Sequence, residues 1–323
     1  MRRLIIRIGG FMCFFSIFKR EPKPFNEGFL DVGDGHEIHY MEFGNKKGAP
    51  LIHFHGGPGG SLRASTVNGF DLKKYRVVLF SQRGCGLSKY KNLLAENTTF
   101  ASVKDAFLLL KHLRINAKVL VSGGSYGATL ALLFALAYPQ KVKALLISAV
   151  FLGRKKDLEF PYKEMFLFYP DVRAELLRLA GKKDITTHFT DKIFSDKYKD
   201  IQEALQYYGA YEHQLGEMMP SFKKAPSITD AKINSLKIFL TYINNNLFLK
   251  EDYILKNIDK IKDIPCLIVH NRFDFCCPLE NAWLVHKKMR RSKLVINEDY
   301  NHSSPKLKAR LKKEREAFLK NIL

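Results

Sequence analysis

The chain has 323 residues, of which 46% are hydrophobic and 12% aromatic, and this composition excludes an intrinsically disordered protein. The length allows one large domain or a domain with an insertion. Lys and Arg outnumber Asp and Glu by 53 to 32, a formal net charge of +21, which favours contact with anionic surfaces such as membrane headgroups. No nucleic-acid-binding motif accompanies this charge, so we expect no nucleic-acid partner.

The first 24 residues hold an apolar stretch between basic ends. The apolar part, Ile8 to Phe18, is too short to span a bilayer as a helix, and no small-residue cleavage site follows it. Three interpretations stay open for this segment. It is a signal peptide, an anchor that contacts an anionic membrane surface through residues 1–20, or the product of a wrongly assigned start codon. We expect the folded domain to begin near Phe25.

Strand and helix patterns alternate over the next part of the chain. Residues 28 to 43 predict two strands around the turn Gly33-Asp34-Gly35, and Phe100–Leu113 has helical spacing. Apolar runs predict further strands at Leu51–Phe54, Val77–Phe80, Val119–Val121, Val142–Ala149, Cys266–His270 and Leu294–Ile296. The alternation predicts an α/β fold with a mostly parallel sheet and helices on both faces.

Residues 151–249 differ in character from what precedes and follows them. They read as helical, aromatic and charged segments without a buried strand pattern. The strand pattern then resumes, and a basic helix closes the chain. We therefore expect a core built from residues 25–150 and 250–323, with residues 151–249 inserted as a helical domain.

The segment KVLVSGGSYGATLALLFALAYP places Ser125 between a strand pattern and a helix pattern. Val119–Val121 is typical of a buried strand, and the Ala- and Leu-rich run after the serine ends at a proline, as a helix would. Gly123 and Gly127 flank Ser125 as G-x-S-x-G, which is typical of the sharp turn that presents a nucleophile. The pattern predicts Ser125 as a catalytic nucleophile.

A serine nucleophile needs a base and a carboxylate that orients the base. After a turn of this kind the acid and then the histidine follow in chain order. Asp274 and His302 each follow one of the last two predicted strands, which places both at the carboxyl edge of the sheet. Glu298 and Asp299 lie on the loop of His302 itself and are expected to be solvated, and His270 is expected in the core.

Acyl transfer also needs donors for the negative charge that develops on the carbonyl oxygen. The backbone N–H of Tyr126, directly after Ser125, is one expected donor. The glycine loop HGGPGG, residues 55–60, follows an early strand and supplies the second, for which we expect Gly57. Gly56 in the same loop is expected to contact substrate.

Together these motifs resemble the proline iminopeptidase family of serine peptidases, within the α/β-hydrolase superfamily. The resemblance spans roughly residues 29 to 304, in HGGPGG (55–60), SQRGCGLS (81–88), GGSYGATLAL (123–132), FLGR (151–154), RFDFCCP (272–278) and NHSS (301–304). It implies an α/β-hydrolase fold with a helical cap over the active site. It also implies removal of an N-terminal residue, typically proline, from small peptide or amide substrates, without a cofactor or metal.

The resemblance further implies that cap glutamates bind the free amino end of the substrate. The first of them matches Glu212 in YYGAYE, whereas the second position reads Asn244 in YINNNLF. An arginine of the family reads Ser148, and the aspartate before its Gln-Arg-Gly reads Ser81. An amide accepts a hydrogen bond but carries no charge, so Asn244 should bind an ammonium group more weakly than a glutamate would.

Two other functions stay open. The first is an esterase or amidase for uncharged small substrates, with a cap re-specified by Asn244 and Ser148. The second is a non-catalytic hydrolase fold that serves as a binding or membrane-surface scaffold, against which the complete set of Ser125, Asp274 and His302 argues.

The cysteines show neither C-x-x-C spacing nor a zinc-site arrangement with histidines. We expect reduced thiols and a cytoplasmic protein. The five are Cys13, Cys85, Cys266, Cys276 and Cys277.

Overall fold

The computed structural model describes residues 4–8, 11–15, 21–215, 227–300, 302 and 304–322. Near the start of the chain, β1 (Leu4–Ile8) and β2 (Phe11–Phe15) pair antiparallel as a separate two-stranded sheet. The side chains of residues 1–20, on which the expected membrane contact depends, lie outside the described residues. Within the described part of the chain, no helix has the length and apolar character needed to cross a bilayer.

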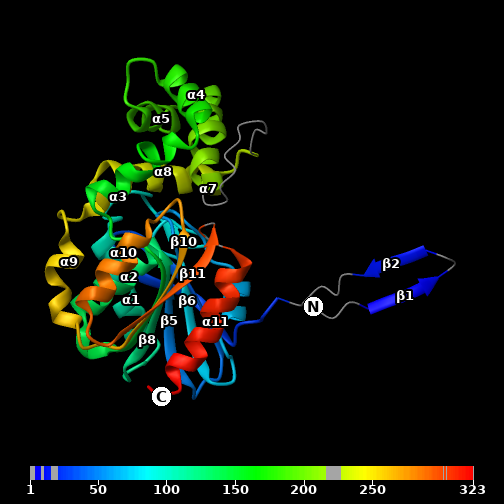
Figure 1. Ribbon diagram of the computed structural model, residues 1–323, viewed down its shortest axis with the longest axis vertical. Coiled ribbons are helices and arrows are strands. Elements are labelled where there is room, and N and C mark those ends of the chain that lie inside the picture. Colours follow the sequence, from blue (N-terminus) through cyan, green and yellow to red (C-terminus); the bar gives the residue numbers. More distant parts are fainter. Residues whose placement is uncertain are drawn as a thin grey trace.

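A single sheet forms the centre of the core (Figure 1). In spatial order its strands are β11 (Ser292–Tyr300), β10 (Cys266–Phe273), β9 (Val142–Val150), β8 (Val119–Ser125), β5 (Ala49–Phe54), β6 (Tyr75–Phe80), β4 (His36–Gly44) and β3 (Asn26–Gly33). Neighbours from β11 to β6 run parallel, while β4 is antiparallel to β6 and β3. The mostly parallel sheet predicted from the sequence is confirmed. The short β7 (Lys89–Tyr90), which pairs with β4, was not predicted.

Helices cover both faces of this sheet (Figure 1). The helices α1 (Thr99–His112), α2 (Tyr126–Ala137) and α10 (Leu279–Lys288) share one apolar core with the sheet, and α11 (Pro305–Leu319) and the short turn η1 (Ala64–Gly69) share the other. Successive residues of a strand point to opposite faces. Val119 and Val121 of β8 therefore enter the first core and Leu120 enters the second, which explains the unbroken apolar run.

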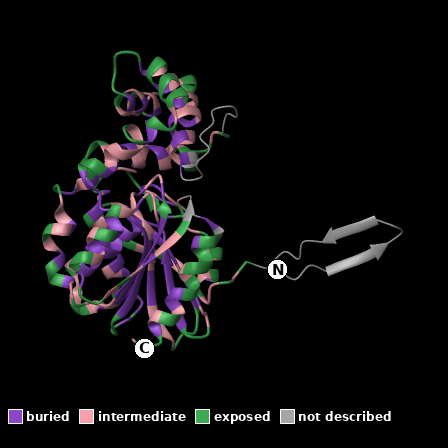
Figure 2. Ribbon diagram, viewed as in Figure 1, coloured by how far each residue is buried: buried purple, intermediate pink, exposed green. Residues whose placement is uncertain are grey.

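Between β9 and β10 the described chain is helical and contains no strand. Its α-helices are α3 (Lys155–Glu159), α4 (Pro170–Ala180), α5 (Ile185–Ile193), α6 (Tyr198–Ala204), α7 (Ala210–Leu215), α8 (Asp230–Asn244) and α9 (Tyr253–Asn257). Helices α4 to α8 have an apolar core of their own around Leu176, Phe189 and Tyr208, separate from the buried strands below (Figure 2). We call α3 to α8 the cap, and they lie beyond the carboxyl edge of the sheet (Figure 1). The domain boundaries at residues 151 and 249 stay a prediction.

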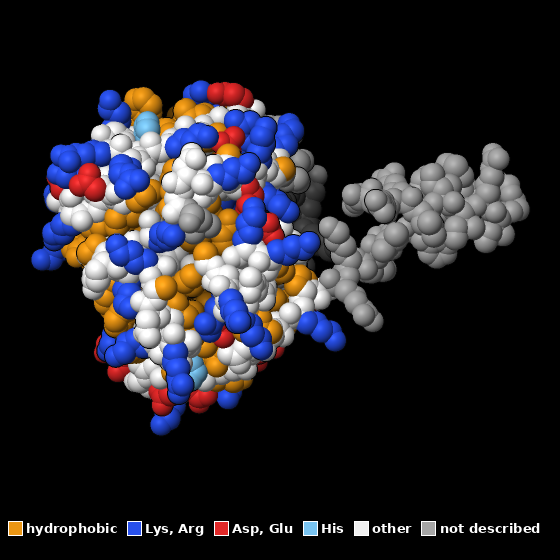
Figure 3. Space-filling view, turned by 90° about the horizontal axis from the view of Figure 1, so that it is seen from below, with side chains coloured by type: hydrophobic (Ala, Val, Ile, Leu, Met, Phe, Trp, Pro, Cys, Tyr) orange, Lys and Arg blue, Asp and Glu red, His pale blue; other side chains and the backbone are white. Residues whose placement is uncertain are grey.

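The positive charge is scattered rather than gathered in a stripe on the face that Figure 3 shows. On the end of the core opposite the cap, Lys and Arg side chains are scattered among apolar and acidic ones (Figure 3). The basic C-terminal segment forms α11, which packs Leu307 and Leu319 against the sheet. This face gives no support to a nucleic-acid partner.

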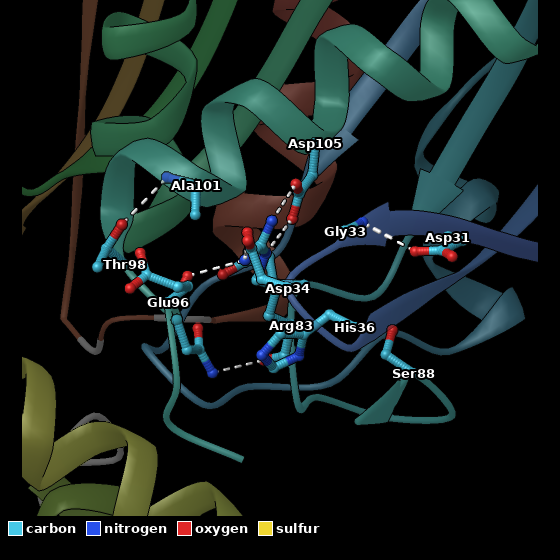
Figure 4. Close-up of polar contacts among 12 residues, drawn as sticks. Asp31, Gly33, Asp34, His36, Arg83, Ser88, Glu96, Thr98, Ala101 and Asp105 are labelled. Atoms are coloured by element: carbon cyan, nitrogen blue, oxygen red, sulfur yellow. Dashed lines mark hydrogen bonds and ion pairs between the residues drawn. The ribbon is translucent and has the colours of Figure 1, made fainter. Parts of the chain in front are cut away.

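A buried ion-pair network holds the loop that follows β6 (Figure 4). The guanidinium of Arg83, 1% exposed, donates to both carboxylate oxygens of Asp105, at 2.8 and 2.9 Å. It also donates to Asp34 at 3.0 Å and to the carbonyl oxygen of Glu96 at 2.9 Å. Arg83 thereby ties this loop to α1 and to the turn between β3 and β4.

Replacing Arg83 with methionine should lower the free energy of unfolding by about 3–5 kcal/mol, because the Asp105 carboxylate would stay buried without its partner. Urea unfolding followed by circular dichroism measures this loss. The double variant Arg83→Met/Asp105→Asn should recover part of it, since the amide carries no charge. Equal stability of Arg83→Met and the wild type would show that the pair makes no net contribution.

Candidate active site

The predicted nucleophile turn joins β8 to α2. Ser125 has φ 57° and ψ −131°, a costly conformation for a residue with a Cβ atom. A Cβ on Gly123 would lie 2.1 Å from the carbonyl oxygen of Gly127, and a Cβ on Gly127 would lie 2.3 Å from that of Phe54. Close backbone contacts therefore require both glycines, and the turn directs Ser125 into a cavity.

His302 and Asp274, which follow β11 and β10, form a hydrogen-bonded pair. Nδ1 of His302 lies 2.9 and 2.8 Å from the two carboxylate oxygens of Asp274. A carboxylate only accepts, so Nδ1 carries the proton and Nε2 keeps a free lone pair. Burial acts to lower the pKa of His302, but the adjacent Asp274 outweighs it and raises this pKa above its ordinary value. Such a histidine can act as a general base.

The Asp274 carboxyl is fixed by backbone groups as well as by His302. Its Oδ1 accepts hydrogen bonds from the N–H groups of Cys276, at 3.0 Å, and Cys277, at 2.9 Å. Burial acts to raise the pKa of Asp274, but His302, His270 and the backbone donor outweigh it and hold this pKa below its ordinary value. Asp274 is therefore ionised while it orients the imidazole.

A cavity of about 720 Å³ lies between the cap and the core. Ser125, His302 and Gly57 line it from the core, and Tyr162 and Glu212 line it from the cap. The structure thus brings the predicted nucleophile, base, glycine loop and cap glutamate to one cavity. Asp274 stands directly behind His302.

The glycine loop lies beside the nucleophile. A Cβ on Gly56 would lie 3.4 Å from the Cβ of Ser125, and Gly57 has a φ of 136°. Because α2 begins at Tyr126, its N–H has no partner within the helix. Gly56 therefore lies against Ser125, and Gly57 follows it in the same loop at the wall of the cavity. The assignment of the Gly57 and Tyr126 N–H groups as oxyanion donors stays a prediction.

Glu212 comes from α7 and faces the cavity. Tyr162 donates a hydrogen bond to Oε1 of Glu212, and Tyr162 in turn lies 2.5 Å from the hydroxyl of Tyr208. No cation pairs with Glu212 among the described residues, and burial raises the pKa of its carboxyl to about 8. A positively charged ligand would supply the missing partner and favour the ionised form.

Asn244 does not reach the cavity. It is the last residue of α8, and its exposed side chain donates a hydrogen bond to Thr190 of α5 at 2.9 Å. This placement contradicts the expected substrate contact, because the end of the helix turns the side chain outward. Ser148, at the other departure from the family pattern, is buried beside Gly124.

Comparison with known proteins gives the same assignment. The model of the α/β hydrolase fold family matches residues 49–309. A proline iminopeptidase from Arabidopsis thaliana is 34% identical over 291 residues, which cover 87% of this chain and 76% of that protein. Another from Xylella fastidiosa is 33% identical and covers 88% of this chain and 93% of that protein. The chain belongs to the proline iminopeptidase family of α/β hydrolases.

Solved structures share the fold of this family member at much lower identity. A hydrolase from Pseudomonas aeruginosa aligns with a TM-score of 0.62 and 14% identity, covering 91% of this chain and 98% of that one. A putative lipase from Acinetobacter baumannii aligns with a TM-score of 0.60 and 18% identity, covering 92% and 91%. At these identities the likeness shows the fold alone.

Two supporting residues of this proline iminopeptidase family member were missed by the sequence analysis. Nδ1 of His55 donates to the carbonyl of Gly56 at 2.8 Å, and its Nε2 accepts from the N–H of Gln82 at 3.1 Å. Burial lowers the pKa of His55 to about 4, so the neutral ring shapes the glycine loop. Tyr162 carries no motif, and only its contact with Glu212 reveals it.

His270, predicted as a core residue, is fully buried and links two parts of the site. Its Nδ1 accepts from the N–H of Val150 at 3.0 Å, and its Nε2 donates to the carbonyl of Cys277 at 2.9 Å. Burial lowers the pKa of this ring, so it stays neutral. It thereby supports the loop that carries Asp274.

Asp274, Cys276 and His302 place potential ligand atoms within 4.8 Å of one another, a spacing that a metal ion could use. Asp274 and His302 are already bonded to each other. Burial raises the pKa of the Cys276 thiol well above its ordinary value, which disfavours the thiolate that a metal prefers. We interpret the group as the catalytic pair with a neighbouring thiol, and the expected absence of a cofactor stays a prediction.

Proposed function

We propose that the chain is a serine hydrolase that removes the N-terminal residue, proline in particular, from short peptides through an acyl-enzyme. Ser125 attacks the carbonyl carbon while Nε2 of His302 takes its proton. The N–H groups of Tyr126 and Gly57 bind the oxyanion that forms. Asp274 stabilises the imidazolium, which then protonates the leaving amine.

Water completes the cycle in the same geometry. His302 deprotonates a water molecule, which attacks the acyl-enzyme on Ser125, and the free amino acid leaves. A buried, neutral thiol beside the nucleophile does not compete with it, because burial raises the pKa of Cys277 well above its ordinary value.

The observation that carries the substrate assignment is Glu212, a carboxyl group in the cavity without a cationic partner among the described residues. The free ammonium of a substrate's first residue would be that partner. Tyr162 would hold the carboxylate in place as its second hydrogen-bond partner. The exopeptidase specificity follows, because only a chain that begins at this residue offers an ammonium there.

An esterase or amidase for uncharged substrates is the second candidate. It is favoured by the position of Asn244 outside the cavity and by Ser148 at the arginine position, which leave Glu212 without the charged neighbours that the family resemblance implies. The two candidates share the nucleophile and differ in their need for a free amine.

Removal of the substrate's charge tests the assignment. Proline-β-naphthylamide should be cleaved far better than its N-acetyl form, and Glu212→Gln should lower kcat/KM for the free-amine substrate about 10- to 100-fold, because the isosteric amide lacks the charge. The same variant should leave the poor rate on the acetylated substrate unchanged. Equal rates on both substrates with the wild-type enzyme would establish the esterase or amidase instead.

The pH dependence of protein stability gives a second test, with the same Glu212→Gln variant. The folded-state pKa of Glu212, about 8, lies above its ordinary value of 4.5, so the protonated carboxyl favours folding and this contribution is lost as pH rises towards 8. The free energy of unfolding of Glu212→Gln should therefore exceed that of the wild type increasingly between about pH 5 and pH 8. If urea unfolding gives the same difference in free energy of unfolding between the two proteins at every pH in this range, the pKa of Glu212 is not raised.

A further inference from the structure

The chain passes between the core and the cap at two places. It leaves the core at Phe151, after β9, and it returns through Asn246, Leu247 and Phe248, after α8. These three returning residues have successive φ values of 50°, 55° and 56°, a strained path for residues with side chains. Such a path persists only where surrounding contacts hold it.

The two crossings pack against each other. Gly153, just beyond Phe151, has a φ of 70°, and a Cβ on it would lie 2.6 Å from Cδ1 of Leu247. Leu247 is fully buried. The crossings therefore form one packed unit, which we call the cap junction (Phe151–Gly153 and Asn246–Phe248).

A chain of buried hydroxyl groups joins the returning crossing to the nucleophile helix. Oγ1 of Thr99 donates to the carbonyl oxygen of Leu247 at 2.5 Å and lies 3.0 Å from the hydroxyl of Tyr126. A carbonyl only accepts, so the single Thr99 proton goes to Leu247 and the Tyr126 hydroxyl donates to Thr99. All three residues are fully buried, so water cannot replace these bonds cheaply.

The outgoing crossing is bonded to the same helix. Oγ1 of Thr129, also fully buried, donates to the carbonyl oxygen of Phe151 at 2.7 Å. Thr129 lies three residues after Tyr126, in the first turn of α2. Both crossings of the cap junction are thus hydrogen-bonded, directly or through Thr99, to the turn of α2 that begins with an expected oxyanion donor.

We infer that Thr99 and Thr129 are positioning residues that couple the cap junction to the oxyanion hole. The inference rests on the proposed nucleophile and oxyanion donors. Neither threonine touches substrate; each fixes the first turn of α2, and with it the N–H of Tyr126, to the crossings that carry the cap. An oxyanion donor that is slightly misplaced stabilises the oxyanion less. Loss of either threonine's hydrogen bonds should therefore lower the rate of acylation and leave the binding of substrate unchanged.

The experiment compares Thr99→Val, which removes both bonds while keeping the shape, with Thr99→Ser, which keeps the hydroxyl. The rate constant of labelling by a fluorophosphonate is the main measurement, because it needs Ser125 and the oxyanion donors but no particular peptide. We expect labelling of Thr99→Val to be about tenfold slower and that of Thr99→Ser to be close to the wild type. On proline-β-naphthylamide, kcat should fall with KM unchanged within twofold.

Thr241→Val is the matched control, since Oγ1 of Thr241 donates to the carbonyl of Lys237 in its own helix, at 2.8 Å, and to no group of the core among the described residues. It should label at the wild-type rate.

If Thr99→Val does not fold, Tyr126→Phe provides the same test, because it removes the hydroxyl that bonds to Thr99 and keeps the ring. This variant should also slow labelling. Wild-type labelling of Thr99→Val, failure of Thr99→Ser to rescue it, or an effect on KM alone would overturn the inference. Absence of proline-β-naphthylamide cleavage by a wild-type enzyme that still labels would contradict the proposed substrate and leave this test intact.

Discussion

Replacing Ser125 with alanine is expected to lower kcat by about 10⁶-fold and to abolish labelling by fluorophosphonates, because nucleophile and base act as one unit. Alanine keeps the Cβ atom, so the strained φ of 57° is no worse than in the wild type and the fold should persist. Steady-state rates on proline-β-naphthylamide and mass spectrometry of the labelled protein give the two measurements.

Other serine and cysteine residues that line the cavity provide control variants for this result. Ser61 and Ser235 also line it but lie outside the nucleophile turn, so Ser61→Ala and Ser235→Ala should still be labelled. Cys277 lines the same cavity as Ser125, and Cys277→Ala tests whether a thiol substitutes for the serine. Labelling that persists in Ser125→Ala and disappears in Cys277→Ala would mean that the nucleophile has been misassigned.

The sheet and the positions of Ser125, Asp274 and His302 could be predicted because they follow from local patterns. Apolar runs identify buried strands, and parallel strands all bring their carboxyl ends to one edge. A residue just after such a run is therefore placed by topology, whatever its other neighbours are. The observed strands contain all six predicted from apolar runs, with ends shifted by a few residues.

The direction of a side chain at the end of a cap helix could not be predicted in this way. The family resemblance matched Asn244 to the second cap glutamate by its place in the sequence. Its hydrogen bond to Thr190 instead depends on where α8 ends and how α5 packs beside it. The raised pKa of Glu212 and the hydrogen bonds of Thr99 to Leu247 and Tyr126 likewise arise from groups far apart in the sequence. Hydrogen bonds between residues far apart in the sequence produce no local sequence pattern from which they could be predicted.

Replacing Asp274 with asparagine is expected to lower kcat/KM about 10⁴-fold, although the two side chains have the same shape. The N–H groups of Cys276 and Cys277 both point at Oδ1 and require an acceptor there. The amide oxygen must therefore occupy that position, which places the NH₂ group at the position of Oδ2, 2.8 Å from Nδ1 of His302. This NH₂ group favours the tautomer in which Nδ1 accepts and the ring proton lies on Nε2, which leaves the base no lone pair for Ser125. The amide oxygen, 2.9 Å from Nδ1, is the one acceptor that competes for the original tautomer.

The pH profile separates this tautomer effect from simple loss of structure. In the wild type Asp274 raises the pKa of His302 above its ordinary value of 6.5, so kcat/KM should fall as pH drops through that raised value. Without the carboxylate, burial is unopposed, and the inflection in Asp274→Asn should move to lower pH. Labelling by a fluorophosphonate should slow in parallel with kcat/KM, since both need the same base. An asparagine variant with the wild-type rate, or with an unshifted inflection, would mean that Asp274 does not orient His302. Glu298, which lies near the end of β11 and pairs with Arg272, would then be the carboxylate to test.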